Sequence, residues 1–446
     1  MTITENTGSA SSDSQPLEDL DITDTTRYAE RGYPWEAWDR LRSEAPIFWY
    51  EKPDHHPFWA VTRYADIHEV HCHPDVFVNS ERLRLDTKDN DYKLDRMRIR
   101  RAVRNGWDTD EPLDMVFMDA PKHTDLRSIV MRAFTPAAMR RIEPELQALA
   151  KRFTDEFMAK LRADGSADLV NDFSIKVPLA TICHLMGLPV DDYERIVEFT
   201  NALIDPDDLP YAKPGESQVE MRRRLFRDFH AYIDELLAER RELIAAGEGG
   251  DDIISKLVAA DTPAGPLTDQ QLHGYVNLLI AAGNETTRNA ITGGVAALLQ
   301  HPEEAARLAA EPDGLVETAV EEMLRWTSPV IQFARTAMAD YELGGQLIRA
   351  GEDVGLFYPS ANRDDHQFDD PYRFDVGRDP NFHLAFGHGP HFCLGANLAR
   401  WEMRAVFAEL APHLSEIALA GEPGRVRHLH VAAIKSLPVS AVRSAR

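Results

Sequence analysis

A single cysteine, Cys393, lies in a glycine-rich segment directly before an amphipathic stretch, and this arrangement suits a thiolate ligand for a metal. Residues 386–400 read FGHGPHFCLGANLAR. The partial positive charge and free N–H groups at the start of a helix stabilise a thiolate and lower the thiol pKa. Gly387, Gly389 and Gly395 let the backbone turn sharply and approach a flat partner closely. A zinc site would need further cysteine or histidine ligands at short spacing, and these are missing.

A second segment, AGNETT at residues 282–287, combines small, acidic and hydroxyl side chains inside a strongly helical pattern. A glycine in a helix interior costs about 1 kcal/mol relative to alanine. Gly283 therefore indicates the close approach of something bulky, or a local opening of the helical hydrogen bonds. Glu285, Thr286 and Thr287 could relay protons at such a site. The segment taken alone is equally consistent with a small-residue packing face that carries a surface glutamate.

Three further sets of charged side chains are weak signals when taken singly. Glu322 and Arg325 are spaced as an i,i+3 pair, which is common on helices and stabilises them by a few tenths of a kcal/mol. His123 and Arg127 are spaced i,i+4 and fall on one helix face. Arg335 follows the segment of Glu322 and Arg325. Each of the last three would more often be a surface charge.

The elements that must position these residues are mainly helical. The clearest helix begins at Thr268, where Thr268 and Gln271 match a capping box, and it ends before Pro302. Another helix ends before Pro329, and the last strong helix begins beside Cys393. Strand patterns rich in aromatic and β-branched residues, or joined by a Gly-Gly turn, occur at residues 47–64, 331–338, 341–351 and 352–359. The predicted fold class is mainly α with a smaller β part.

Composition excludes several classes of protein. The chain has 446 residues, and its 49 basic against 74 acidic side chains give a net charge of −25, which argues against nucleic acid as a partner. Neither a membrane helix nor a signal peptide is visible, so we expect a cytoplasmic protein. Residues 1–27 are predicted to be a disordered acidic tail and residues 28–446 a single domain. The three cysteines fit a reducing compartment, with Cys72 and Cys183 as inert structural thiols.

The cysteine segment resembles the haem-binding loop of the cytochrome P-450 family, F-G-x-G-x-H/R-x-C-x-G. The resemblance implies that Cys393 is the axial thiolate of the iron of haem b, and that His391 contacts a haem propionate. The resemblance also implies that His123, Arg127 and Arg335 bind the haem propionates. The implied fold places the haem between the long central helix and the helix that follows the cysteine. The positions of the motif that this chain matches are Phe386, Gly387, Gly389, His391, Cys393 and Gly395.

The same resemblance extends to the AGNETT segment, because the family carries A/G-G-x-D/E-T at this relative position. It implies that Ala282 and Gly283 line the oxygen pocket. Glu285 and Thr286 would then act as the catalytic pair that delivers protons during oxygen activation.

The Glu322-x-x-Arg325 pattern also has a counterpart in the family, where a later arginine joins the pair in a structural network. Arg373 fits that third place, although the glutamate that usually precedes this arginine is Tyr372 here. These residues should fold the cysteine loop rather than catalyse.

The implied activity is a haem-thiolate monooxygenase that inserts one oxygen atom from O2 into a hydrophobic small molecule. Three cysteines cannot supply a plant-type iron–sulfur cluster, and no motif indicates a fused nicotinamide or flavin domain. Electrons from NAD(P)H should therefore arrive through a separate ferredoxin and its reductase, and the enzyme is expected to be a monomer. The basic patch expected to receive the ferredoxin comprises Arg132, Arg140, Arg141, Arg400 and Arg404.

The substrate pocket is the least specific part of the interpretation. No fixed charge occurs among the candidate residues, which favours a neutral substrate such as a terpenoid, a steroid or an aromatic or aliphatic hydrocarbon. Core packing is the alternative for each of them. Two rival functions are a peroxide-driven peroxygenase, against which the acid–threonine pair argues, and a non-catalytic haem sensor or binding protein. The candidate substrate contacts are Trp107, Phe117, Leu278, Ala281, Val330, Ile331 and Phe333.

Overall fold

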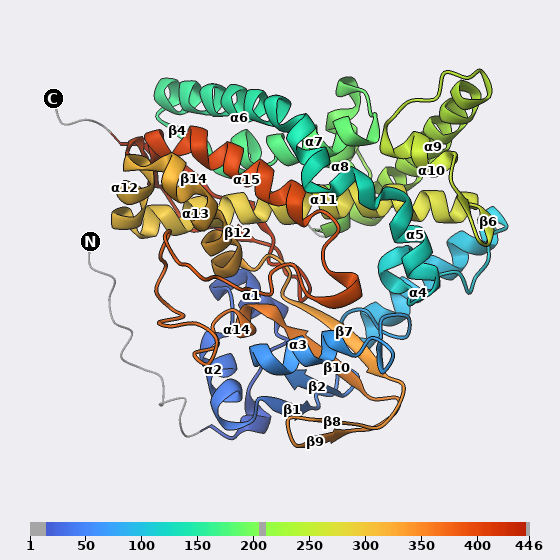
Figure 1. Ribbon diagram of the computed structural model, residues 1–446, viewed down its shortest axis with the longest axis horizontal. Helices are drawn as coiled ribbons and strands as arrows, with labels where there is room; N and C mark the ends of the chain where they lie inside the picture. The colour runs from blue at the N-terminus through green and yellow to red at the C-terminus, as the bar shows by residue number, and fades with distance from the viewer. Residues whose placement is uncertain (1–14, 205–210, 443–446) are drawn as a thin grey trace.

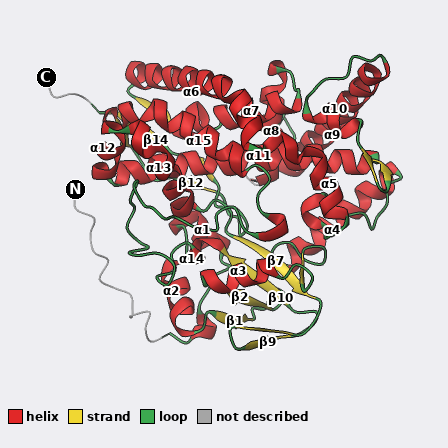
Figure 2. Cartoon of the chain, in the orientation of Figure 1, coloured by secondary structure: helices red, strands yellow, loops and turns green. Residues whose placement is uncertain are grey.

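The computed structural model describes residues 15–204 and 211–442, which form a large helical part and a smaller sheet part (Figures 1 and 2). The helices are α1 Thr25–Arg31, α2 Trp35–Glu44, α3 Tyr64–Cys72, α4 Lys88–Asn105, α5 Lys122–Met131, α6 Pro136–Asp164, α7 Lys176–Met186, α8 Tyr193–Ile204, α9 Gln218–Ala245, α10 Ile253–Val258, α11 Asp269–Gln300, α12 Pro302–Ala310, α13 Pro312–Thr327, α14 Tyr358–Ala361 and α15 Ala396–Leu410. The strands are β1 Ile47–Tyr50, β2 Phe58–Val61, β3 Phe77–Val78, β4 Ser166–Asp168, β5 Asp261–Thr262, β6 Gly265–Pro266, β7 Gln332–Ala337, β8 Tyr341–Leu343, β9 Gln346–Ile348, β10 Asp353–Phe357, β11 Ile417–Leu419, β12 Gly424–Arg425, β13 Ile434–Ser436 and β14 Pro438–Ala441.

The main sheet has five strands in the order β1-β2-β10-β7-β3. β2 and β10 run parallel, and the other neighbours are antiparallel. The strands IFWY and FWAV are rich in the aromatic and β-branched residues that suit a pleated, half-buried surface. In the register of β7 against β10, Arg335 lies opposite Val354, which fixes that arginine on a central strand.

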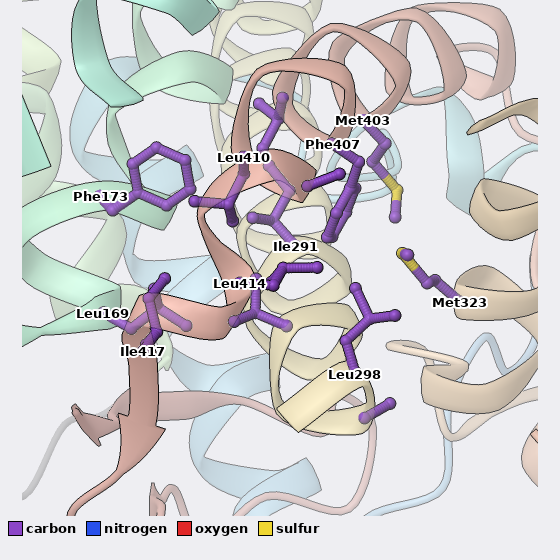
Figure 3. Packing of buried hydrophobic residues seen from close by; sticks show 14 of the residues in the cluster. Leu169, Phe173, Ile291, Leu298, Met323, Met403, Phe407, Leu410, Leu414 and Ile417 are labelled. Atoms are coloured by element: carbon purple, nitrogen blue, oxygen red, sulfur yellow. The ribbon is translucent and has the colours of Figure 1, made fainter. Parts of the chain in front are cut away.

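The long helix α11 runs through the centre of the helical part and contacts α7, α13 and α15 (Figure 1). Its capping box is present as predicted, since Thr268 and Gln271 each cap the other's backbone N–H group. Figure 3 shows how Ile291 and Leu298 of this helix pack against Phe407 of α15 and Met323 of α13. Helix α11 therefore supports α15, the helix that follows the cysteine loop.

The predicted disordered tail is wrong for residues 15–27, while residues 1–14 lie outside the described part of the chain. Leu20 and Ile22 are buried in an apolar cluster that includes Trp38. The Asp21 carboxylate accepts hydrogen bonds from the backbone N–H groups of Thr23 (2.8 Å) and Asp24 (3.0 Å). Two buried apolar side chains and a capped turn order this acidic segment, which composition alone does not reveal.

Other predicted elements are confirmed. A Gly344-Gly345 turn joins β8 to β9, and both glycines have positive φ angles (53° and 81°) that favour glycine. Helix α13 ends at Thr327, directly before Ser328 and Pro329. Within residues 15–204 and 211–442, no helix is both long and apolar enough to cross a bilayer.

Candidate active site

The cysteine loop is held by backbone contacts on both sides. The N–H group of Cys393 donates to the carbonyl of Phe386 (2.9 Å), which closes the loop before α15 begins at Ala396. Gly387 and Gly389 adopt left-handed φ angles of 68° and 71°. A Cβ atom on Gly389 would lie 2.4 Å from the carbonyl oxygen of His71 in α3, so only glycine fits there.

The Cys393 thiol lies deep within the protein and still faces open space. Burial raises its pKa, while the Gly395 N–H group and the guanidinium groups of Arg127 and Arg400 lower it in part. The lowering of the thiol pKa that the sequence predicts is thus present, but the effect of burial on this pKa is larger. More than a third of the residue's surface is nevertheless accessible. The residue is therefore accessible although its thiol is desolvated, and a bound cation would be needed to keep it as a thiolate.

Four basic side chains from distant segments gather beside this loop: His123 and Arg127 of α5, Arg335 of β7, and His391. The rings of His123 and His391 stack at 3.9 Å, and Arg127 donates to the carbonyl of Phe392 (2.6 Å). Burial and then the charges of its basic neighbours lower the pKa of His391 to about 2. None of the four forms an ion pair with a carboxylate of the described residues, although Arg335 is only 4% exposed. This donor set fits a ligand that brings its own carboxylates.

The middle of α11 presents Ala282 and Thr286 on an accessible side. The Thr286 hydroxyl donates to the carbonyl of Ala282 (2.8 Å), and more than a third of the surface of Ala282 is accessible within an otherwise well-buried helix. The helix continues without a break, so the opening considered for Gly283 is absent. The bulky neighbour of Gly283 is Ile182 of α7, whose Cγ1 would lie 3.0 Å from an added Cβ atom. Gly283 therefore serves helix packing on that side.

Glu285 is buried, with 2% of its surface exposed, and belongs to a polar network. One carboxylate oxygen accepts hydrogen bonds from Arg288 and from the side chain of Asn289 (2.9 Å). Arg288 continues to Asn201 of α8 (3.0 Å), and Asn201 donates to the hydroxyl of Tyr211 (2.9 Å). The second Glu285 oxygen has no hydrogen-bond partner among the described residues.

The structural network around Glu322 differs from the sequence prediction in its third member. Glu322 and Arg325 are fully buried and pair at 2.7 Å; burial raises the pKa of Glu322, but Arg325 lowers it below the usual value. The additional guanidinium on Glu322 is that of Arg378 (3.2 Å). The Arg373 side chain is instead 62% exposed and lies 3.6 Å from Asp375. The prediction for Arg373 is therefore wrong, because two arginines five residues apart in one loop are distinguished only by the path of the backbone.

These elements match those of a known family of enzymes. A family model described as cytochrome P450 matches residues 27–414. The chain belongs to the cytochrome P450 family. Its activity is accordingly that of an oxygenase that uses haem iron and O2.

Relatives and solved structures agree with this membership. The chain is 39% identical over 411 residues to a methyl-branched lipid omega-hydroxylase of Mycobacterium tuberculosis, which covers 91% of this chain and 90% of the relative. It is 36% identical over 419 residues to a steroid C26-monooxygenase of the same organism, covering 92% and 89%. A Mycobacterium marinum cytochrome P450 solved in complex with pseudoionone superposes with a TM-score of 0.82 at 36% identity, covering 96% of this chain and 99% of that one.

The residues of this P450 fit the haem that the family implies. Cys393 is accessible, Ala282 offers an accessible face, and no described atom outside the adjoining backbone lies within 4 Å of a Cβ atom placed on Gly395. The unpaired basic side chains beside the loop match the two propionates. When bound, the haem supplies the activation of dioxygen. Cys393 would hold its iron, and the four residues that would hold the propionates are His123, Arg127, Arg335 and His391.

Five of the expected substrate contacts are partly accessible. Leu278 and Ala281 lie on α11, eight and five residues before Thr286, and Val330 pairs through a single β-bridge with Val431. Phe117 and Phe333 are also half-buried, and the Phe333 ring lies 5.9 Å from the guanidinium of Arg335. Partial accessibility leaves each of these free to contact a ligand. The five residues are Phe117, Leu278, Ala281, Val330 and Phe333.

The other two residues that were expected to contact the substrate have different surroundings. Ile331 is fully buried and packs in the apolar cluster that contains Trp38, so its assignment as a substrate contact is wrong. Trp107 is half-buried, and its ring contacts the guanidinium of Arg101 (4.9 Å) and the ring of His273 (5.2 Å). This tryptophan joins the end of α4 to α11 and lies at the edge of the helical part.

A separate cavity of about 570 Å³ lies further along α11, between that helix and the N-terminal segment. Its walls include Tyr33, Trp35, Trp326 and Arg363. None of the expected haem or substrate residues lines it. This cavity could not be predicted from the sequence, because its walls come from five separate segments.

Proposed function

We propose that this P450 hydroxylates an apolar, uncharged chain such as a methyl-branched lipid, a steroid side chain or a terpenoid. The observation that carries the proposal is the similarity to relatives named for hydroxylation of such molecules, over about nine-tenths of both chains. The half-buried candidate contacts Leu278, Ala281 and Val330 are apolar, which supports a neutral substrate. Basic groups close to the cysteine loop are assigned to the propionates rather than to a substrate acid.

Electrons are proposed to come from NAD(P)H through a separate ferredoxin and its reductase, in the cytoplasm. The expected basic patch is only partly supported. Arg132 is exposed, and so are Arg140 and Arg141, but Arg400 pairs with Glu321 at 2.7 Å. The positive charge that is available to an acidic partner therefore comes from the start of α6 and the turn before it.

Glu285 and Thr286 are proposed to handle the protons that oxygen reduction consumes. Thr286 holds its hydroxyl at the accessible side of α11, next to Ala282. Hydrogen bonds from Arg288 and Asn289 hold the Glu285 carboxylate in place within α11. A peroxygenase would not require the Glu285–Thr286 pair, so the presence of this pair favours a reductively driven monooxygenase.

An optical titration of the ferric holoenzyme tests the substrate class first. Methyl-branched fatty chains, cholestane-type steroids, monoterpenes and polar acids of similar size would each be added, and a low-spin to high-spin shift would mark binding. Turnover with NAD(P)H, a ferredoxin and its reductase should then give a hydroxylated product. Product formed with hydrogen peroxide alone would instead establish the peroxygenase, and binding without product would establish a sensor. A shift only with charged polar ligands would overturn the proposed substrate class.

A further inference from the structure

Helix α3 and the cysteine loop bring together three side chains that sequence analysis did not connect. His68 and Cys72 are one turn apart on α3, and His388 occupies the variable position of the F-G-x-G segment. Cys72, which the sequence predicts to be an inert structural thiol, is exposed. The two histidines are half-buried, which leaves all three donor groups accessible to an ion.

The three donors lie close together, and one pair of them already has the spacing of a tetrahedral metal site. Their ligand atoms all lie within 4.8 Å of one another, and the Cys72 sulfur is 3.6 Å from Nδ1 of His68. A tetrahedral zinc ion with Zn–S of about 2.3 Å and Zn–N of about 2.0–2.1 Å separates its sulfur and nitrogen ligands by about 3.5 Å. The imidazole rings of His68 and His388 lie 4.1 Å apart, at an angle of 36°. The Cys72–His68 pair therefore already has the required separation, and His388, whose ligand atom lies within 4.8 Å of both, must move closer to complete the site.

The orientation of His68 is fixed by its own helix. Tyr64, one turn earlier, stacks on the His68 ring with an interplanar angle of 13°. Cys72 follows one turn later, so the three side chains form one stripe along α3. This stripe presents the imidazole and the thiol to the loop that carries His388.

We propose that His68, Cys72 and His388 bind a zinc ion at the surface, with a water molecule as the fourth ligand. Two imidazoles and one thiolate are soft or borderline donors that select Zn²⁺ over Mg²⁺ and Ca²⁺, which prefer oxygen ligands. The site is distinct from the haem ligand Cys393, which lies five residues after His388. Its ligands come from both α3 and the cysteine loop.

The position of the site gives the ion a structural effect. The last turn of α3 already contacts the loop, because the His71 carbonyl lies 2.4 Å from a Cβ atom placed on Gly389 and the His71 ring lies 3.8 Å from one placed on Gly387. An ion shared by both segments fixes α3 against the loop that precedes Cys393. Zinc therefore stabilises the folded state by binding it in preference to the unfolded chain.

The experiment uses the untagged, haem-loaded protein, with zinc chloride as the probe. Calorimetric titration and metal analysis after gel filtration should show one zinc ion per chain. The zinc K-edge X-ray absorption, which is separate from that of haem iron, should contain one sulfur at about 2.3 Å. Zinc should also raise the midpoint of thermal unfolding, whereas Mg²⁺ at the same concentration should not.

Cys72→Ser and His388→Ala should each weaken zinc binding by more than about tenfold, since loss of an outer-shell partner alone typically has that effect. His56→Ala, which removes an exposed histidine outside the cluster, is the matched control and should bind zinc like the wild type. The carbon monoxide spectrum of each reduced variant establishes that the haem site is intact. Absence of stoichiometric binding, a zinc edge without sulfur, or equal affinity in Cys72→Ser would overturn the proposal.

Discussion

Arg378 and Arg373 offer a direct test of the network beneath the cysteine loop, because the structure assigns them opposite roles. Arg378 is 11% exposed and pairs with the buried carboxylate of Glu322 at 3.2 Å. It also donates to three backbone carbonyls of the same loop at 2.7, 2.9 and 3.2 Å. Replacement by alanine therefore removes an ion pair to a buried carboxylate and three hydrogen bonds to the backbone of the loop.

The expected size of the effect follows from burial. Removing one partner of a buried ion pair typically costs about 3–5 kcal/mol. Because Arg325 still neutralises Glu322 after the change, we expect the lower end of this range, about 3 kcal/mol, for Arg378→Ala. Arg373→Ala removes a 62% exposed side chain and a 3.6 Å ion pair, and should change stability by less than about 0.5 kcal/mol.

The assay is urea unfolding of the two variants and the wild type, followed by fluorescence and by the haem absorbance. Arg378→Ala should also retain less haem after gel filtration, since its loop leads to Cys393. Arg378→Lys, which keeps the charge but loses the planar guanidinium, should be intermediate. An equal loss of stability in Arg373→Ala, or a loss below about 1 kcal/mol in Arg378→Ala, would refute the assignment.

Three further predictions concern protons and electrons. Burial raises the pKa of Glu402 to about 8, so the folded protein binds this proton more tightly than the unfolded chain does. Its contribution to the free energy of unfolding should therefore fall by about 3–5 kcal/mol between pH ~4.5 and pH ~8. Urea unfolding of Glu402→Gln across this interval should lack that decline, and a parallel pH profile would contradict the assignment. Thr286→Ala should consume NAD(P)H while releasing hydrogen peroxide, whereas Thr286→Ser should keep product formation; unchanged coupling in Thr286→Ala would remove this residue from the proton path. Arg132→Glu should slow reduction by a ferredoxin in a salt-dependent way, and more than Arg404→Glu does, because Arg404 is already paired with Glu317 at 2.9 Å. Stopped-flow reduction rates compare the two, and a larger effect at Arg404 would contradict the proposed docking charge.

Local sequence was sufficient wherever the determining interactions are local. The capping box at Thr268 and the Gly344-Gly345 turn depend on residues a few positions apart, and both occur as predicted. The conformation of the cysteine segment is also determined by nearby residues, since the left-handed glycines and the start of the helix lie within ten residues of Cys393. The helix-rich fold class and the family therefore follow from the sequence alone.

Tertiary structure decided the features that depend on which distant segments meet. Arg378 rather than Arg373 reaches Glu322, and Ile331 is buried beneath the N-terminal segment instead of facing a ligand. The stacking of His123 on His391 and the approach of His388 to α3 join parts of the chain that are far apart in sequence. The type of a residue determines which groups its side chain can bind. Whether that side chain is buried or paired depends on its neighbours in space. Those neighbours are fixed only when the whole chain has packed.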